Sequence, residues 1–183
     1  ILERYENPSG RESKEVLLYG YVNALFQSGL KSPLEEAVLS HGEVSHVGYK
    51  KIQEIPFDFF RKRLSVIVEH EQKRIVISKG APEEVLSVCT VTHAEKIKAL
   101  DRFHQLSAQG FRVLAVARRT VLKKERYTET DEVRMAYMGL MAFYDPPKKS
   151  AKRVLKELAE HGVEVKILTG DGDLVTRHVC EEL

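Results

Sequence analysis

The sequence has few cysteines and no long apolar run. Its two cysteines, Cys89 and Cys180, lie far apart and form no C-x-x-C pattern. We therefore expect buried, reduced thiols rather than a disulfide framework. No stretch approaches the roughly 20 apolar residues that cross a bilayer, and the first residues resemble neither a signal peptide nor an initiator. These absences indicate a soluble piece of a larger chain.

The sequence also has little net charge. Its 29 basic and 27 acidic residues give a formal charge of +2, which predicts no nucleic-acid partner and no direct membrane contact. Basic residues gather only locally, at Arg61-Lys62-Arg63 and Lys148-Lys149. The seven histidines are scattered, and His41 and His46 lack the i, i+4 spacing of a zinc-binding helix, so no metal site is predicted.

The 183 residues, 43% of them hydrophobic, suffice for one domain or one domain and part of another. Residues 1–14 are polar and contain Pro8 and Gly10, which indicates a linker. Apolar periodicity, capping residues and β-branched runs then predict the following elements. Helices are expected at about 15–26, 32–40, 82–89, 94–108 and 148–161 and from Asp171 onward, and strands at 64–68, 74–79, 111–117, 135–144 and 163–168.

The order of these elements changes character near residue 140. Up to that point paired strands, including a hairpin over residues 64–79, are interleaved with helices. Beyond it, strand and helix alternate as in a parallel, Rossmann-like layer. The predicted fold class is α/β, with an antiparallel sheet flanked by helices in residues 15–140 and a partial Rossmann-like unit in residues 141–183.

One segment pairs aromatic rings with cations. Residues 56–65 read P-F-D-F-F-R-K-R-L-S, which supplies rings to stack on a purine base and cations to attract phosphates. The plainer interpretation is a core phenylalanine followed by a solvated basic edge. Composition alone favours that interpretation, because core aromatics outnumber base-stacking ones.

Three other candidates also have structural alternatives. Lys79 ends a predicted strand beside Gly80, where a backbone can approach a ligand closely, but lysines at strand ends are usually just solvated. Arg112 lies one residue into a predicted apolar strand. It is interpreted either as an edge residue of the sheet or as a partner for phosphate. Glu35 lies three residues after Ser32, which is the spacing of a helix capping box.

In this order, the segments resemble the nucleotide-binding domain of P-type cation-transporting ATPases. Five motifs carry the resemblance: P-F-x-x-x-x-K/R-R, K-G-A-P-E, G-x-R-V-L-A, D-P-P-R/K and T-G-D. They occur here at residues 56–63, 79–83, 110–115, 145–148 and 169–171. The resemblance covers nearly the whole chain from residue 15 and assigns residues 15–140 to the nucleotide-binding domain and 141–183 to part of the phosphorylation domain.

The resemblance implies a role for each matching residue. Phe57 stacks on adenine, Lys62 and Lys79 line the base and phosphate pocket beside Gly80, Arg112 reaches the phosphates, and Glu35 lies near the adenine amino group. In the phosphorylation domain, Thr169, Gly170 and Asp171 lie near the transferred phosphate.

Two positions depart from the family pattern. Phe59 stands where the family frequently has an arginine that contacts phosphate or ribose, and Arg61 or Arg63 is a candidate substitute for that contact. Gly172 stands where the family has an asparagine.

Residues 28–39 and 57–66 are most similar to bacterial magnesium-transporting P-type ATPases, with proton and calcium pumps as the alternatives. The resemblance implies a cytoplasmic domain of a bacterial inner-membrane pump that uses ATP with Mg²⁺ and works with further phosphorylation, actuator and transmembrane domains. The D-K-T-G-T sequence, whose aspartate accepts the phosphate, does not occur in this chain. The chain alone is therefore expected to bind ATP without forming the phosphoenzyme.

Two other functions fit parts of the sequence. Asp171-Gly172-Asp173-Leu174-Val175 fits the D-x-D-x-[TV] pattern of haloacid dehalogenase-type phosphatases, but too little chain follows it for their sheet. A non-catalytic regulatory domain is the other alternative, and it requires every motif to be merely structural.

Overall fold

The computed structural model describes residues 1–42, 44–148, 150–170 and 172–183. Asp171, one of the predicted site residues, therefore lies outside the described residues. In chain order the elements are β1 (Leu2–Glu6), α1 (Lys14–Phe26), α2 (Pro33–Leu39), β2 (Lys50–Asp58), β3 (Arg63–His70), β4 (Lys73–Gly80), α3 (Pro82–Ser87), α4 (His93–Ala108), β5 (Arg112–Val121), the short 3₁₀-helix η1 (Glu129–Asp131), β6 (Ala136–Phe143), α5 (Ala151–Glu160) and α6 (Asp173–Glu182).

Among the described residues, six strands form one antiparallel sheet in the order β1-β6-β5-β4-β3-β2. The predicted hairpin is confirmed, since β3 and β4 pair from Arg63–Gly80 to His70–Lys73. The sequence did not assign β2, which pairs along the outer side of β3. The α/β fold with an antiparallel sheet flanked by helices is thus confirmed.

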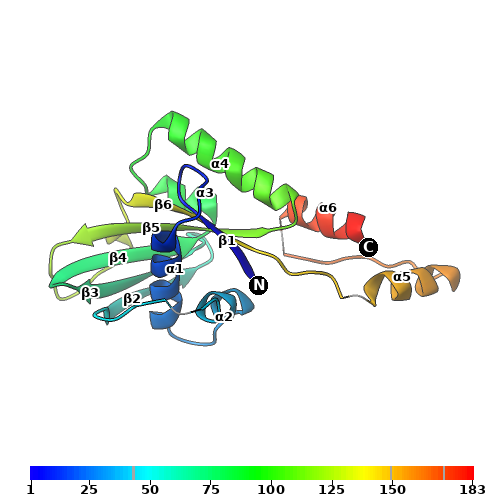
Figure 1. Cartoon of the computed structure of the whole chain (residues 1–183), viewed down its shortest axis with the longest axis horizontal. Helices are drawn as coiled ribbons and strands as arrows, with labels where there is room; N and C mark the ends of the chain where they lie inside the picture. The colour runs from blue at the N-terminus through cyan, green and yellow to red at the C-terminus, as the bar shows by residue number, and fades with distance from the viewer. Residues whose placement is uncertain (43, 149, 171) are drawn as a thin grey trace.

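Helices cover both faces of this sheet (Figure 1). Side chains of a strand alternate between faces, so Val66 and Val68 of β3 pack in a cluster with α1 and α2. Ile67, between them, packs in a second cluster on the other face, with α3 and α4. The capping box at the start of α2 is confirmed, because the Ser32 backbone N–H donates to the Glu35 carboxylate at 2.9 Å.

The interpretation of residues 1–14 as a linker without packed structure is wrong for β1. This strand pairs antiparallel with β6, with Leu2 opposite Phe143, and both Leu2 and Glu6 are buried. The backbone partners come from residues about 140 positions later in the chain. Local composition carries no information about such a distant partner. The polar sequence of residues 1–14 therefore gave no sign of a strand.

The strand predicted at 163–168 is also wrong. The structure describes all six of these residues and they form no strand. Val163, Val165 and Ile167 are exposed by 47%, 45% and 50%, and no strand among the described residues offers this segment backbone partners. Residues 141–183 thus show no Rossmann-like layer in their described part. Instead α5 lies away from the sheet and α6 lies beside the end of α4 (Figure 1).

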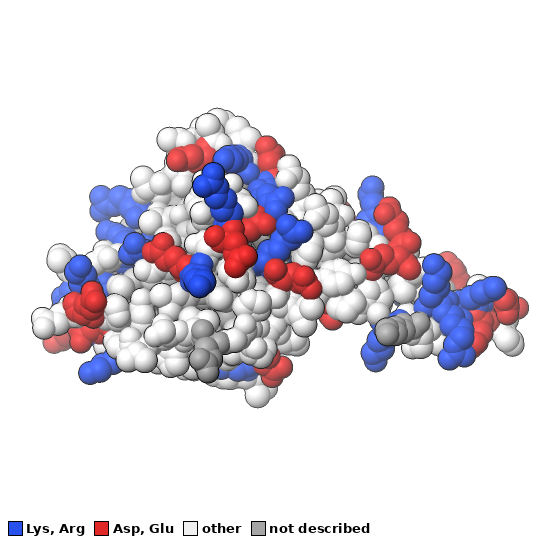
Figure 2. All heavy atoms as spheres, in the orientation of Figure 1, with Lys and Arg blue, Asp and Glu red and all other residues white. Residues whose placement is uncertain are grey.

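Charges of both signs are interspersed over the face seen in Figure 2. Both cysteines are free, as expected, but Cys180 is exposed where a buried thiol was predicted. Within the described residues, no helix combines the length and the apolar character that a membrane span requires.

Candidate functional site

The segment between β2 and β3 is a tight turn that exposes aromatic side chains. The Asp58 carboxylate accepts hydrogen bonds from the backbone N–H groups of Phe60 and Arg61, at 2.9 and 2.8 Å. This side-chain capping of the turn leaves Phe57, Phe59 and Phe60 exposed by 51%, 85% and 92%. Rings in such positions contribute little to the core and are available to a ligand.

Lys62 adopts a backbone conformation that favours glycine. Its φ is +44°, in the left-handed region that costs a residue with a Cβ about 1–2 kcal/mol. Its backbone N–H donates to the Asp58 carbonyl at 2.7 Å, and its carbonyl accepts from the Ala81 N–H at 2.9 Å. These two bonds hold Lys62 between the turn and the end of β4.

Gly80 allows this close approach. A Cβ on Gly80 would lie 2.3 Å from the Lys62 carbonyl oxygen and 2.6 Å from the Arg63 Cα, both backbone atoms. The glycine of the K-G-A-P-E segment therefore lets the turn carrying Lys62 rest against β4. Close packing of the turn against β4 thus explains why a glycine stands at this position beside the predicted site.

These segments border a cavity of about 550 Å³. Phe57, Lys62, Gly80 and Arg112 line it, so four of the predicted site residues meet at one place. The helix α4 adds Phe103, His104 and Ser107 to the wall. Phe57 and Lys62, from the same turn, thus meet Arg112, from β5, at one cavity.

Gly170 lines the same cavity, together with the first residues of α6. α6 packs against the α4–β5 corner, where a Cβ on Gly110 would lie 2.3 Å from the His178 ring. Val175 is buried in this contact region. Gly170 of the T-G-D motif therefore lines the cavity. Thr169 is not among the described residues that line it, and Asp171 lies outside the described residues.

Lys79 and Glu35 contact each other instead of lining the described cavity. The Lys79 Nζ lies 2.7 Å from the Glu35 Oε1, and the two side chains are exposed by 5% and 9%. Burial acts to raise the pKa of Glu35, but the Lys79 ammonium and hydrogen bonds from Ser32 lower it overall. Burial also lowers the pKa of Lys79, against the attraction of Glu35. The pair joins the end of β4 to α2.

Arg61 and Arg63, suggested as substitutes for the missing family arginine, are engaged elsewhere. Both bind the carboxylate of Glu132, at 2.6 and 2.8 Å, and neither is among the described residues that line the cavity. Contact of either arginine with a nucleotide stays a prediction based on the resemblance. Sequence reasoning missed Glu132, which lay in a charged connection without any distinguishing pattern.

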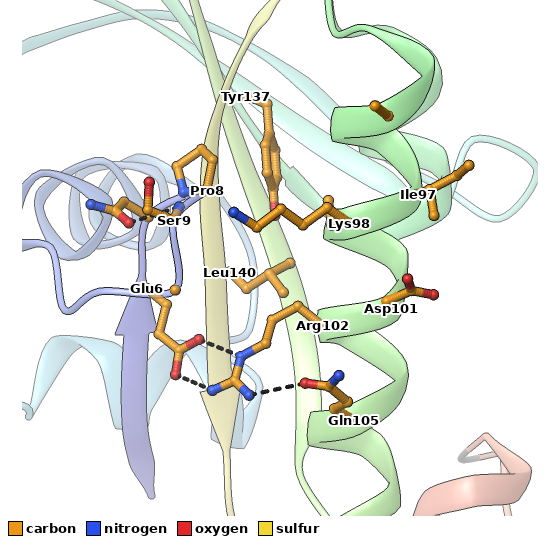
Figure 3. A pocket seen from close by; sticks show the side chains of 14 residues that line it. Glu6, Pro8, Ser9, Ile97, Lys98, Asp101, Arg102, Gln105, Tyr137 and Leu140 are labelled. Atoms are coloured by element: carbon orange, nitrogen blue, oxygen red, sulfur yellow. Dashed lines mark hydrogen bonds and ion pairs between the residues drawn. The ribbon is translucent and has the colours of Figure 1, made fainter.

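A second cavity, of about 490 Å³, lies between β1 and α4 (Figure 3). Arg102 crosses from α4 and donates two hydrogen bonds to the Glu6 carboxylate, each 2.7 Å long. These bonds lower the pKa of Glu6 in spite of its burial. None of the predicted site residues that the structure describes lines this cavity, so it is separate from the candidate site.

The fold and the first cavity define an α/β domain with a ligand-sized site at one end of its sheet. The family model described as "P-type ATPase, cytoplasmic domain N" matches residues 24–150, more than half of the chain. The chain belongs to this family.

Among its relatives, the "Magnesium-transporting ATPase, P-type 1" proteins of Escherichia coli and Salmonella typhimurium are 38% and 39% identical over the whole chain. The "Calcium-transporting ATPase" of Bacillus subtilis is 30% identical over 74% of the chain and is covered over 16% of its own length. The chain spans 22% of the length of the magnesium-transporting relatives.

Proposed function

We propose that the chain binds ATP in the cavity beside Phe57. The adenine ring stacks on Phe57, and Lys62 and Arg112 attract the phosphates, where guanidinium and ammonium groups are suited to polyanions. The observation that carries this proposal is the convergence of a half-exposed ring and two cations on one cavity of about 550 Å³. Sites for small molecules and cofactors typically have volumes of about 300–1,000 Å³.

The chain's part in the reaction is positioning. Phe57 holds the base while the two cations reduce the repulsion within the phosphate chain, so the terminal phosphate is presented in a fixed direction. Mg²⁺ arrives with ATP as its counterion, as it does in other phosphoryl-transfer enzymes. For Lys79 and Glu35, contact with the nucleotide stays a prediction based on the resemblance.

The whole protein, in this proposal, is a cation pump of the bacterial inner membrane with this domain on its cytoplasmic side. It hydrolyses ATP through an aspartyl phosphate formed on its phosphorylation domain, next to Thr169, Gly170 and Asp171, and works with actuator and transmembrane domains. The names of the magnesium-transporting relatives support Mg²⁺ as the transported ion.

A nucleotide titration followed by backbone NMR tests the binding step. ATP and ADP are expected to shift resonances of Phe57, Lys62 and Arg112, and GTP is expected to bind more weakly if the base is read. Phe57→Ala removes the stacking ring, which is worth about 1–3 kcal/mol per base and so weakens ATP binding by about 5- to 150-fold.

Phe60→Ala is the matched control. Phe60 lies in the same turn and is 92% exposed, but it is not among the described residues that line the cavity. Its removal should leave the affinity for ATP unchanged. Equal losses in both variants, or no binding by the folded wild type at millimolar ATP, would favour the regulatory-domain alternative, and turnover of a simple phosphate ester would favour the phosphatase.

A further inference from the structure

Glu132 has a fully buried carboxylate that joins two arginines. Its Oε2 accepts a hydrogen bond from Arg61 Nη1 at 2.6 Å and one from Arg63 Nε at 2.8 Å. Its Oε1 accepts from the Ser65 hydroxyl at 2.6 Å. A carboxylate is buried at this depth only when it is paired and hydrogen-bonded, so the two guanidinium groups are held in defined positions.

Each arginine also binds the backbone of a segment that forms the cavity. Arg61 donates from Nη2 to the carbonyl of Pro56, the residue before Phe57, at 2.9 Å. Arg63 donates from Nη1 to the carbonyl of Glu84, in the first turn of α3, at 3.3 Å. Glu132 is thereby connected to both sides of the cavity, although its own side chain is not among the residues described as lining it.

Lys62 lies between these two arginines in the chain, but it does not share their contacts with Glu132. Lys62 lines the cavity, whereas the side chains of Arg61 and Arg63 turn to Glu132. Because both neighbours are fixed on one carboxylate, the backbone between them has little freedom, and the left-handed conformation of Lys62 is maintained.

From these contacts we infer that Glu132 is a positioning residue for nucleotide binding. Its charge fixes Arg61 and Arg63, and through them it orients Phe57 and Lys62 toward the cavity. The consequence for ATP affinity rests on the proposed function. The consequence for the conformation of the turn needs no ligand, and the two are measured separately.

The first measurement is hydrogen exchange by NMR on the ligand-free 183-residue chain. Glu132→Gln keeps the shape of the side chain and removes its charge. The backbone N–H groups of Lys62 and Ala81, which report on the turn, should exchange about tenfold faster relative to those in the middle of α1. If their exchange changes only as much as that of α1, the charge of Glu132 does not hold the turn and the inference fails.

Asp131→Asn is the matched control for this measurement. Asp131 is the preceding residue and carries the same charge, but its carboxylate pairs with Lys124 at 2.7 Å and accepts from the Thr128 N–H at 2.8 Å, partners that differ from those of Glu132. It should leave exchange at Lys62 and Ala81 as in the wild type. Arg61→Met removes one arm of the arrangement while Arg63 still neutralises Glu132, so it provides the same test if Glu132→Gln does not fold.

The second measurement is the affinity for ATP and AMP. Loss of a charged hydrogen-bonded contact should weaken both by about tenfold in Glu132→Gln and in Arg61→Met. Glu132→Asp should recover part of the loss, and Asp131→Asn should show none. A lower unfolding temperature with unchanged affinities would mean that Glu132 only stabilises the fold, which overturns the inference. A wild type that binds no nucleotide refutes the proposed function instead, and hydrogen exchange then decides only whether the charge of Glu132 holds the turn.

Discussion

Two stretches that are rich in β-branched residues have opposite environments in this molecule. Residues 64–68, L-S-V-I-V, form part of β3, and their side chains are at most 5% exposed. Residues 163–167, V-E-V-K-I, also contain three β-branched residues, here at alternate positions, yet these side chains are about half exposed. β3 lies between β2 and β4. The later stretch has no such neighbours in the described structure, so strand propensity becomes a strand only where other backbone groups complete the hydrogen bonds.

The same contrast extends to the surrounding regions. In the sheet region, residues 2–143, strands are packed between helices on both faces. In the C-terminal region, residues 144–183, α5 is fully described from Ala151 to Glu160 and none of its residues is buried. Packing, rather than local propensity, supplies most of the stability of an element. Matched substitutions in the two regions measure this difference directly.

The largest expected effect comes from isoleucines in the two compared stretches. Ile67→Ala empties a site that is 0% exposed, and deletions of this kind cost about 2–5 kcal/mol of unfolding free energy. Ile167→Ala removes a side chain that is 50% exposed and should change the free energy by less than about 0.5 kcal/mol. Urea unfolding followed by circular dichroism compares them, and similar losses would show that residues 163–167 are packed in solution.

Glycines give the second comparison. Gly80→Ala places a Cβ against backbone atoms of Lys62 and Arg63, so we expect a loss of about 1–3 kcal/mol, as for other overpacked sites, together with displaced resonances of Lys62. A Cβ on Gly170 meets no atom within 4 Å, and Gly170→Ala should alter stability by less than about 0.5 kcal/mol. The same urea titration, with NMR spectra of both variants, checks these outcomes. A neutral Gly80→Ala would mean that the turn is free to move away from β4.

The sequence predicted what is encoded locally. The hairpin of β3 and β4 follows from two β-branched runs, the capped start of α2 from Ser32 with Glu35, and the long α4 from helical periodicity. Each of these signals involves residues close together in the chain. β1 escaped prediction because its partner β6 lies more than 130 residues away. The strand at 163–168 was wrong for the converse reason, since its composition is suitable but no partner is present in the described residues.

The candidate site shows the same division. Motif order brought Phe57, Lys62, Gly80 and Arg112 to attention, and these residues do meet at one cavity. Sequence reasoning did not show that Lys79 pairs with Glu35, or that Arg61 and Arg63 turn to Glu132. Those pairings join residues 44 to 71 positions apart, and a lone glutamate in a charged loop has no pattern that reveals its partners.

Ion pairs provide the smallest contrast, and it depends on pH. Hydrogen bonds from Arg102 lower the pKa of Glu6 below its ordinary value of 4.5, although burial opposes them. The folded state therefore holds this proton less tightly than the unfolded state, so the stabilisation is present above about pH 4.5 and is lost as pH falls through the folded pKa. Glu6→Gln should cost about 1–2 kcal/mol at pH 7, with a difference from wild type that shrinks steadily in more acidic solution.

The matched pair in the C-terminal region is Arg153 and Glu157 on α5, 3.0 Å apart and exposed by 72% and 54%. Exposed pairs at this spacing contribute about 0.3–0.5 kcal/mol and are screened by salt, so Glu157→Gln should stay within that range at pH 7. Urea unfolding at a series of pH values distinguishes the two positions. Two results would contradict the prediction: a cost of Glu6→Gln no larger than that of Glu157→Gln at pH 7, or a cost that is undiminished at pH 3. Either would mean that the bond to Arg102 does not hold β1 to α4. The contrast between the two regions would then not extend to their ion pairs.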